Sequence, residues 1–193
     1  MNRIFYEGKN FENLNFRNNA PETGDYEECT FRNCDFSDSD LSDINFLGCE
    51  FRECNLSLAR LARTSFRDVR FINCKLLGLH FEDCNNLMIS FEFDGCTLDL
   101  SSFYKLKLKK TIFRNSKIIE ADFTETDLTN SSFKSCDLQR TIFKNTNLEG
   151  VDFRTSNNYS IDPDLNRIRK AKFSLPGIAG LLDKYDIEIE NNA

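Results

Sequence analysis

The strongest constraint on this chain is a large hydrophobic residue at every fifth position. Read from Phe31, every fifth residue up to Phe91 is Phe or Leu, except Asn86. After a shift of two residues, the series resumes at Leu98 and runs without a gap through large apolar residues to Phe153. A period of five fits neither a strand, with period two, nor a helix, with period 3.6.

A second column lies two positions before each of these hydrophobic centres. It contains all eight cysteines, and it has no charged residue. Two inward positions in every five require a chain that turns a corner every five residues, so four corners close one coil of twenty residues. Because one coil cannot bury its inward residues alone, stacked coils must share a core. We therefore predict an all-β solenoid of square section, with about six coils after Cys29 and nearly one more before it.

The repeat divides the chain into two parts. Residues 1–156 form the predicted solenoid, with a loop near 17–25 that contains Pro21 and Gly24, and with the phase shift near 91–97. Residues 157–193 form a predicted tail outside the repeat. The pair Asp162-Pro163 is typical of a helix start, which predicts a helix over 163–172. A short helix over 178–184 and a short edge strand over 186–190 should follow.

The tail carries apolar residues that need a place to pack. Those that we assign to a cap or a dimer contact are Leu165, Ile168, Phe173, Leu175, Ile178, Leu181, Leu182 and Tyr185. Two interpretations remain open at this point. The tail either covers the open end of the solenoid only, or covers it and also forms a twofold dimer.

These columns resemble the pentapeptide-repeat family, whose consensus is a small residue, Asp or Asn, a central Leu or Phe, and two variable positions. The segments 121–125 (ADFTE), 126–130 (TDLTN) and 136–140 (CDLQR) fit it closely. The resemblance covers roughly Ile4 to Arg154. It implies a right-handed quadrilateral β-helix of pentapeptide repeats, here with a short helical C-terminal cap.

The resemblance also implies a function. The best-understood members of the family mimic duplex DNA and bind type II topoisomerases. They include quinolone-resistance proteins of the Qnr type and immunity proteins against gyrase-poisoning peptides, and they dimerise through a C-terminal helical module. For this chain the resemblance implies DNA gyrase or topoisomerase IV as the partner, and a homodimer. A protein-interaction scaffold with another partner is the alternative hypothesis.

Composition excludes several other classes. The net charge of −6 and a pI near 5.0 argue against direct nucleic-acid binding. No run approaches the roughly 18–20 apolar residues of a membrane span, and the N-terminus lacks the apolar stretch of a secretory signal. We expect no membrane association and a cytoplasmic location, the latter because eight free thiols indicate a reducing compartment.

No constellation of residues points to catalysis. All eight cysteines occupy the inward small-residue column, so we interpret them as core residues, with metal binding or redox sensing as the alternative. His80 is the only histidine and is expected at the surface. Without a second histidine, a buried carboxylate pair or a phosphate-binding loop, we predict no enzyme activity, no cofactor and no metal.

The outward positions supply the candidate partner surface. Acids that could imitate phosphates form two clusters: Asp35, Asp38, Asp40 and Asp43, and then Glu120, Asp122, Glu125 and Asp127. A basic column of unassigned role follows one set of centres: Arg32, Arg52, Arg114, Lys134 and Arg154, interrupted by Ile72 and Asp94. Near the phase shift we expect the exposed apolar residues Leu87, Met88, Phe93 and Leu100, either as local repacking or as a contact point for a partner.

Overall fold

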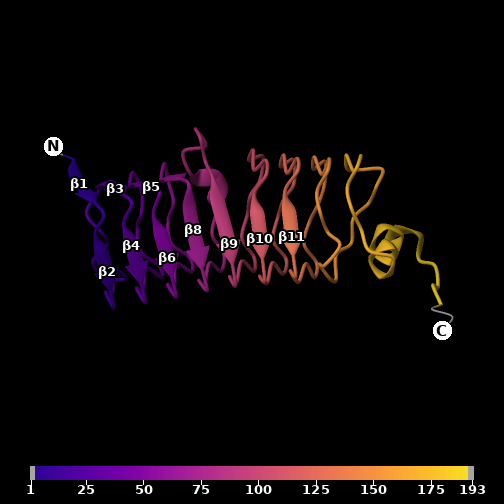
Figure 1. Ribbon diagram of the computed structural model, residues 1–193, viewed down its shortest axis with the longest axis horizontal. Helices are drawn as coiled ribbons and strands as arrows, with labels where there is room; N and C mark the ends of the chain where they lie inside the picture. The colour runs from indigo at the N-terminus through magenta and orange to yellow at the C-terminus, as the bar shows by residue number, and fades with distance from the viewer. Residues whose placement is uncertain (1–2, 191–193) are drawn as a thin grey trace.

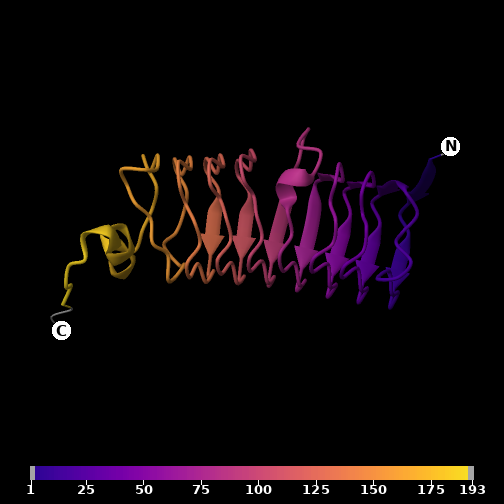
Figure 2. The same ribbon diagram turned by 180° about the vertical axis from the view of Figure 1, so that it is seen from behind.

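The chain winds into a rod of stacked coils, and the computed structural model describes residues 3–190 of it (Figure 1). The rod is an all-β parallel solenoid of about 7 turns, a right-handed quadrilateral β-helix, as the repeat and the family resemblance predicted. A short helical cap lies at its C-terminal end, and the view from behind shows the same regular stack (Figure 2). Within the described residues, no helix has the length and apolar composition needed to cross a membrane.

The strands are short because each occupies one side of a coil. All pairings between them are parallel, and they form a four-stranded sheet in the order β1-β3-β5-β7 and a seven-stranded sheet in the order β11-β10-β9-β8-β6-β4-β2. Their bounds are β1 Ile4–Glu7, β2 Asn10–Glu12, β3 Gly24–Glu27, β4 Thr30–Arg32, β5 Asn45–Leu47, β6 Glu50–Arg52, β7 Ser65–Arg67, β8 Val69–Ile72, β9 Phe91–Asp94, β10 Ile112–Arg114 and β11 Ser132–Lys134.

Residues twenty apart lie side by side, and after the phase shift the spacing across it is twenty-two. This register defines four faces, which we number by their buried centres. Face 1 has Tyr26, Phe46, Phe66, Leu108, Leu128 and Leu148; face 2 has Phe31, Phe51, Phe71, Phe93, Phe113, Phe133 and Phe153; face 3 has Phe36, Leu56, Leu76, Leu98, Ile118 and Leu138; face 4 has Leu41, Leu61, Phe81, Phe103, Phe123 and Phe143. All of these side chains are buried.

The aromatic rings form columns that change position along the rod. Face 2 holds a continuous column, in which the Phe113 and Phe133 rings stack with centroids 4.6 Å apart. Towards the N-terminus the second column is on face 1, where Phe46 and Phe66 stack at 5.4 Å. Towards the C-terminus the second column is on face 4 instead, and its rings meet face 2 edge-on, as Phe123 meets Phe133 at 90°.

The phase shift lies where the second aromatic column changes face. Arg63 still pairs with Asp83 at a spacing of twenty, so the two extra residues lie between Cys84 and Ser90, just before the predicted range of 91–97. Asn86, which would be a centre of face 1, is exposed in this loop.

Phe91 compensates for the missing centre. It was predicted as a hydrophobic centre, but it pairs with Val69 and therefore stands in the column that otherwise holds small residues. Its ring lies 5.7 Å from that of Phe66 and 5.1 Å from that of Phe81, so it links the face 1 column to the face 4 column. Phe93, expected to be exposed, is fully buried because it continues face 2.

The corners need a left-handed backbone conformation. The residue two positions after most centres has positive φ, and among residues 3–190 none of the non-glycine residues in this conformation is β-branched or aromatic. The Asp or Asn before a centre closes the same corner: the Asp122 carboxylate accepts from the Thr124 N–H at 2.7 Å, and Asn85 accepts from Leu87 at 3.1 Å. This explains the Asp or Asn of the repeat.

Segment 17–25 was predicted to interrupt the repeat, and it does not. β1 pairs with β3 and β2 pairs with β4 at the ordinary spacing of twenty. Pro21 is buried at the position of a face 4 centre. Gly24 is buried in the small-residue column, where a Cβ atom would lie 2.4 Å from the Ile4 carbonyl oxygen.

The predicted helix over 163–172 is wrong. These residues make another turn of the solenoid, in which Arg167 pairs with Asn147 and Lys172 with Asp152, so the ladder extends beyond the predicted boundary at residue 156. The local helix-start signal at Asp162-Pro163 is outweighed by the backbone partners that the preceding coil offers. The predicted short helix is present as two 3-10 segments, η2 (Pro176–Leu181) and η3 (Asp183–Tyr185). Residues 186–190, predicted as an edge strand, are exposed and form no strand.

Candidate functional site

Six of the eight predicted acids lie along one side of the rod. Asp38, Asp40 and Asp43 occupy face 4 and its two corners, and Glu120, Asp122 and Glu125 occupy the equivalent positions four coils further on. At the spacing of parallel strands, four coils separate the two clusters by roughly 19 Å. Asp35 lies on face 3 and Asp127 on face 1, so the structure does not bring them to this side.

Most of the clustered acids have a basic partner one coil away. In the first cluster, Asp38 pairs with Arg17 at 2.9 Å, Asp40 with Arg60 at 3.4 Å and Asp43 with Arg63 at 2.6 Å. In the second, Glu120 pairs with Arg140, Glu125 with Lys105 at 3.6 Å, and Asp127 with Lys109 at 3.2 Å. These partners reduce the negative potential over both clusters, because a cation within 4 Å offsets part of the charge of each paired carboxylate.

Hydrogen bonds stabilise the ionised form of three acids in the first cluster, Asp35, Asp40 and Asp43. The hydroxyl and N–H of Ser37 donate to Asp35 and lower the pKa of that carboxyl, and Ser42 does the same for Asp40. The hydrogen bond from Arg63 lowers the pKa of Asp43. These acids are therefore negatively charged at neutral pH and are held in fixed positions.

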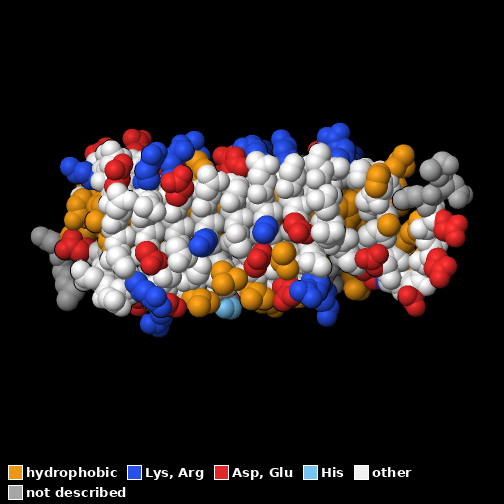
Figure 3. Space-filling view, turned by 90° about the horizontal axis from the view of Figure 1, so that it is seen from below, with side chains coloured by type: hydrophobic (Ala, Val, Ile, Leu, Met, Phe, Trp, Pro, Cys, Tyr) orange, Lys and Arg blue, Asp and Glu red, His pale blue; other side chains and the backbone are white. Residues whose placement is uncertain are grey.

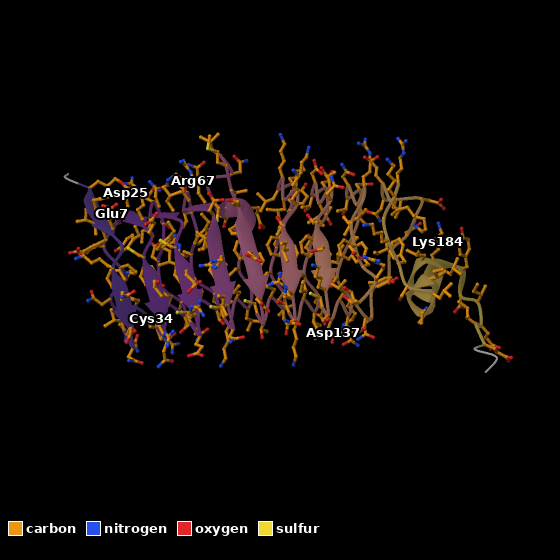
Figure 4. The ribbon with its side chains drawn as sticks, viewed as in Figure 1. Glu7, Asp25, Cys34, Arg67, Asp137 and Lys184 are labelled. Atoms are coloured by element: carbon orange, nitrogen blue, oxygen red, sulfur yellow. The ribbon has the colours of Figure 1, made fainter. Side chains whose placement is uncertain are left out.

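The surplus of negative charge lies at the N-terminal end. Residues 1–53 contain 12 acids and 5 bases, a net charge of −7, whereas residues 54–193 contain 19 acids and 20 bases, a net charge of +1. Glu7 and Glu27 are direct neighbours in the ladder of face 1, and Glu28 follows at the corner (Figure 4 labels Glu7). Within residues 3–190, no lysine or arginine pairs with these three glutamates.

The sequence analysis missed this group of glutamates, although their spacing of twenty residues could have indicated it. Like charges that face each other across a ladder destabilise it. Core packing therefore gives no reason for Glu7 beside Glu27, which makes the pair a candidate for contact with a partner.

The predicted basic column is in register along face 2, but it is mostly neutralised. Arg52 pairs with Glu50, Arg114 with Asp94 at 3.3 Å, and Arg154 with Asp152 at 2.7 Å. The hydrogen bond from Arg154 lowers the pKa of Asp152 to about 2. Three of its five cations are thus held in local ion pairs, and Ile72 and Asp94 interrupt it, so the column is not a continuous positive stripe.

The C-terminal cap combines packed and exposed apolar residues. Ile168, Phe173 and Leu181 pack against the core, while Leu165, Leu175, Ile178 and Tyr185 are exposed, Leu175 to 86%. Leu182 is half-buried.

Two glycines and one lysine hold the cap in place. A Cβ atom on Gly177 would lie 2.0 Å from the Tyr159 hydroxyl, and one on Gly180 would lie 2.1 Å from the Tyr159 carbonyl oxygen, so only glycine allows this approach. Lys184 pairs with Asp162 at 2.6 Å and also with Asp164, where the cap meets the last turn (Figure 4).

The thiols are inside the rod and the histidine is outside, as predicted. All eight cysteines are free and buried, and burial raises the pKa of the Cys49 thiol to about 12 and that of Cys136 to about 11. His80 is exposed, with Nδ1 3.1 Å from the Glu82 carboxylate. In the described part of the chain, no three His, Cys, Asp or Glu side chains are grouped closely enough to hold a metal ion.

Comparison with known proteins gives the same architecture. A family model for the pentapeptide repeat region matches residues 25–92 and 87–160. Two solved structures of trypsin-treated variants of QnrB1, a plasmid-mediated fluoroquinolone resistance protein, align with 96% and 97% of this chain and with 99% and 100% of their own. Their TM-scores are 0.64 and 0.62 at 19% and 18% identity, so the likeness concerns the fold. No curated protein matches the sequence.

Proposed function

The chain belongs to the pentapeptide-repeat family, and on that premise we propose that it binds a type II topoisomerase, DNA gyrase or topoisomerase IV, in the place of duplex DNA. Bound in this way, it protects the enzyme from a quinolone or a peptide toxin. It acts as a non-enzymatic protein in the cytoplasm, where its free thiols stay reduced.

The observation that carries this proposal is the net charge of −7 over the first 53 residues of a rigid, filled rod. A DNA mimic needs fixed negative charges over an extended surface. The glutamates Glu7, Glu27 and Glu28 supply such charges, and the neighbouring cluster of Asp35, Asp38, Asp40 and Asp43 extends them. The alignment with a fluoroquinolone resistance protein over nearly its whole length supports the same reading.

The test is gyrase supercoiling in the presence of ciprofloxacin, over a concentration series of the protein. We expect supercoiling to be restored at low protein concentration and inhibited at high concentration, where the mimic displaces DNA. If neither supercoiling nor its inhibition by the drug changes at any concentration, the proposal is wrong.

Matched variants locate the surface. The triple variant Glu7→Gln, Glu27→Gln, Glu28→Gln and the triple variant Asp38→Asn, Asp40→Asn, Asp43→Asn should both lose protection. Asn retains the corner hydrogen bond of Asp40 and suits the left-handed backbone at the other two positions, so the fold is preserved. The variant Glu120→Gln, Glu125→Gln, at equivalent positions on the near-neutral part of the rod, serves as the control and should protect like the wild type.

We also propose that the C-terminal tail forms a twofold dimer. The support is the exposure of Leu175 and Ile178 on a cap that is otherwise docked. Light scattering should give twice the monomer mass of 22.4 kDa, and Leu175→Asp should give the monomer. A monomeric wild type at micromolar concentration would contradict this part.

A protein-interaction scaffold is the second candidate function. It is favoured by the ion pairs that neutralise both predicted acidic clusters, because a DNA mimic gains little from paired carboxylates. This alternative predicts saturable capture of a partner other than a topoisomerase, together with no effect in the supercoiling assay.

A further inference from the structure

The charges of face 1 are divided between two groups of opposite sign. Face 1 runs along the upper edge of the rod in Figure 1, and Asp25 is labelled on it in Figure 4. On the coil of Tyr26, this face and its corner with face 2 carry Asp25, Glu27 and Glu28. Four coils further on, the same three positions around Leu108 carry Lys107, Lys109 and Lys110. Three acids and three lysines thus lie roughly 19 Å apart on one face.

Both groups keep part of their charge free. Arg3 pairs with Asp25 at 3.0 Å, and Asp127 pairs with Lys109 at 3.2 Å. Within residues 3–190, no ion pair is formed by the four that remain, Glu27, Glu28, Lys107 and Lys110.

The positions that flank these groups do not cancel them. On the corner between faces 4 and 1, the charges over the same coils sum to zero: Asp43, Arg63, Asp83 and Lys105. On the adjoining edge of face 2, Glu50 pairs with Arg70 and Glu92 with Arg114. Between the two groups, face 1 and its corner with face 2 carry only Arg67 and Asp68, which are opposite in sign.

A hollow and a projecting loop lie between the two charged groups. The hollow has a volume of about 240 Å³ and is centred on the coil of Phe46. At its floor, Ser65 Oγ and Arg67 Nε are buried and have no hydrogen-bond partner within residues 3–190, so the hollow offers polar atoms to a group from outside. The loop over 84–90 stands out from the same edge of the rod two coils further on (Figure 1), with Leu87 and Met88 exposed to 61% and 71%.

These features are complementary to themselves about the coil of Phe66. If a second copy lies antiparallel against face 1, with the twofold axis beside Phe66, each row of side chains on this face meets the same row of the other copy in reverse order. The acids around Tyr26 then face the lysines around Leu108 of the second copy. The hollow over Phe46 faces the projecting loop of the second copy. By symmetry each of these contacts is made twice.

Face 3 has no such division of charge. Along it the signs alternate, in the order Arg17, Asp35, Lys75, Asp99, Lys117 and Asp137. The view of the rod from below shows acidic and basic side chains interspersed (Figure 3). We infer that face 1, and not face 3, binds a second copy of this chain in antiparallel orientation. The contact is separate from the C-terminal tail and does not depend on the topoisomerase proposal, although it would hide Glu27 and Glu28 from any other partner.

Sedimentation equilibrium tests the inference in a Leu175→Asp background, which separates this contact from the proposed tail dimer. At low ionic strength the mass should rise with concentration from 22.4 kDa towards twice that value. In about 1 M salt, where the Debye length is about 3 Å, this increase should disappear because the contact depends on exposed charges.

The decisive experiment exchanges the charges. Lys107→Glu, Lys110→Glu and, separately, Glu27→Lys, Glu28→Lys should each associate at least about tenfold more weakly than the background, because like charges then face each other. An equimolar mixture of the two variants should recover the association, since acids of one copy again face lysines of the other at both ends. Both residue types suit the left-handed corners, as Lys105 and Glu120 show.

The matched control is Lys75→Glu, Lys117→Glu, which changes the net charge equally but on face 3. It should associate like the background. The inference is overturned if the charge-reversed variants associate as strongly as the background, if mixing them brings no recovery, or if the background shows no rise in mass at low ionic strength.

Discussion

The two halves of the rod place their aromatic rings differently. Before the phase shift, ring columns run along the adjacent faces 1 and 2, with one further stacked pair, Phe16 and Phe36, on face 3. After it, ring columns run along the opposite faces 2 and 4. The four-stranded sheet of face 1 ends with β7, at the last ring of its column, whereas the sheet of face 2 continues to β11. The square interior therefore accepts two ring columns in either arrangement, but a change between them requires a special coil. The loop over 84–90 and the Phe91 ring provide it.

The largest loss of stability should follow truncation of a ring in the half of the rod after the phase shift. Phe113 stacks on Phe93 at 5.2 Å and on Phe133 at 4.6 Å, and rigid neighbours cannot close the space it fills. We expect Phe113→Ala to lower the free energy of unfolding by about 3–5 kcal/mol, measured by urea denaturation. Phe113→Leu, which keeps most of the volume, is the control and should lose less than half as much.

A smaller loss should follow Phe91→Ala at the junction of the two halves. Phe91 lies beside four rings, but it directly follows the 84–90 loop, which can move inward after truncation. We expect a loss of about 2–3 kcal/mol by the same measurement. If Phe91→Ala costs more than Phe113→Ala, the junction is more rigid than the regular stack and the comparison is reversed.

Acid should weaken a corner closed by aspartate and spare a corner closed by asparagine, such as that of Asn85 beside the phase shift. The pKa of Asp152 is lowered to about 2, so its stabilising contribution is complete above the ordinary Asp pKa near 4 and is lost as the pH falls through 2. That contribution is on the order of 2 kcal/mol. The stability difference between the wild type and Asp152→Asn should therefore be present at pH 5 and vanish near pH 2. At the interrupted corner Asn85 has no carboxyl group, so the protection of the Leu87 amide from exchange should not follow this titration.

The smallest expected change is a gain in stability from a substitution at Met88. Met88 has φ of 60° and is 71% exposed, so it contributes strain and little burial. We expect Met88→Asn to raise the free energy of unfolding by about 0.5 kcal/mol. A loss of stability would show that the Met88 side chain packs on the loop in solution.

The fold was predictable because every inward position has the same environment on each coil. The junction between the two halves was not predictable. Phe91 fits the five-residue series before the phase shift and Phe93 fits the series after it. Only the empty place left by Asn86 decides which ring continues the face 2 column. The helix predicted from Asp162-Pro163 was wrong for a related reason. The helix-start signal depends only on neighbouring residues, whereas the backbone partners of this segment lie on the preceding coil, about twenty residues earlier.

Six of the eight predicted acids lie on one side of the rod, but only some of their basic partners could be inferred from the sequence. The pairs Asp40–Arg60, Asp43–Arg63 and Glu120–Arg140 are each twenty residues apart, so the register alone implies them. The pair Arg17–Asp38 spans twenty-one residues and depends on how a long side chain crosses a corner. Glu7 and Glu27, which have no basic partner among the described residues, are also twenty residues apart and therefore lie side by side. Comparing every charged residue with the one twenty positions later would have identified this pair.

The eight buried thiols can report how the rod unfolds. They are distributed from Cys29 to Cys136, and none is accessible while the coils are stacked. An alkylating reagent can therefore label a thiol only when its coil opens. If the rod opens as one unit, mass spectrometry should find molecules with no label or eight labels; if it frays coil by coil from an end, intermediate masses should appear in the order of the cysteines along the chain. The core residues that make the protein a solenoid thus also record how cooperatively it comes apart.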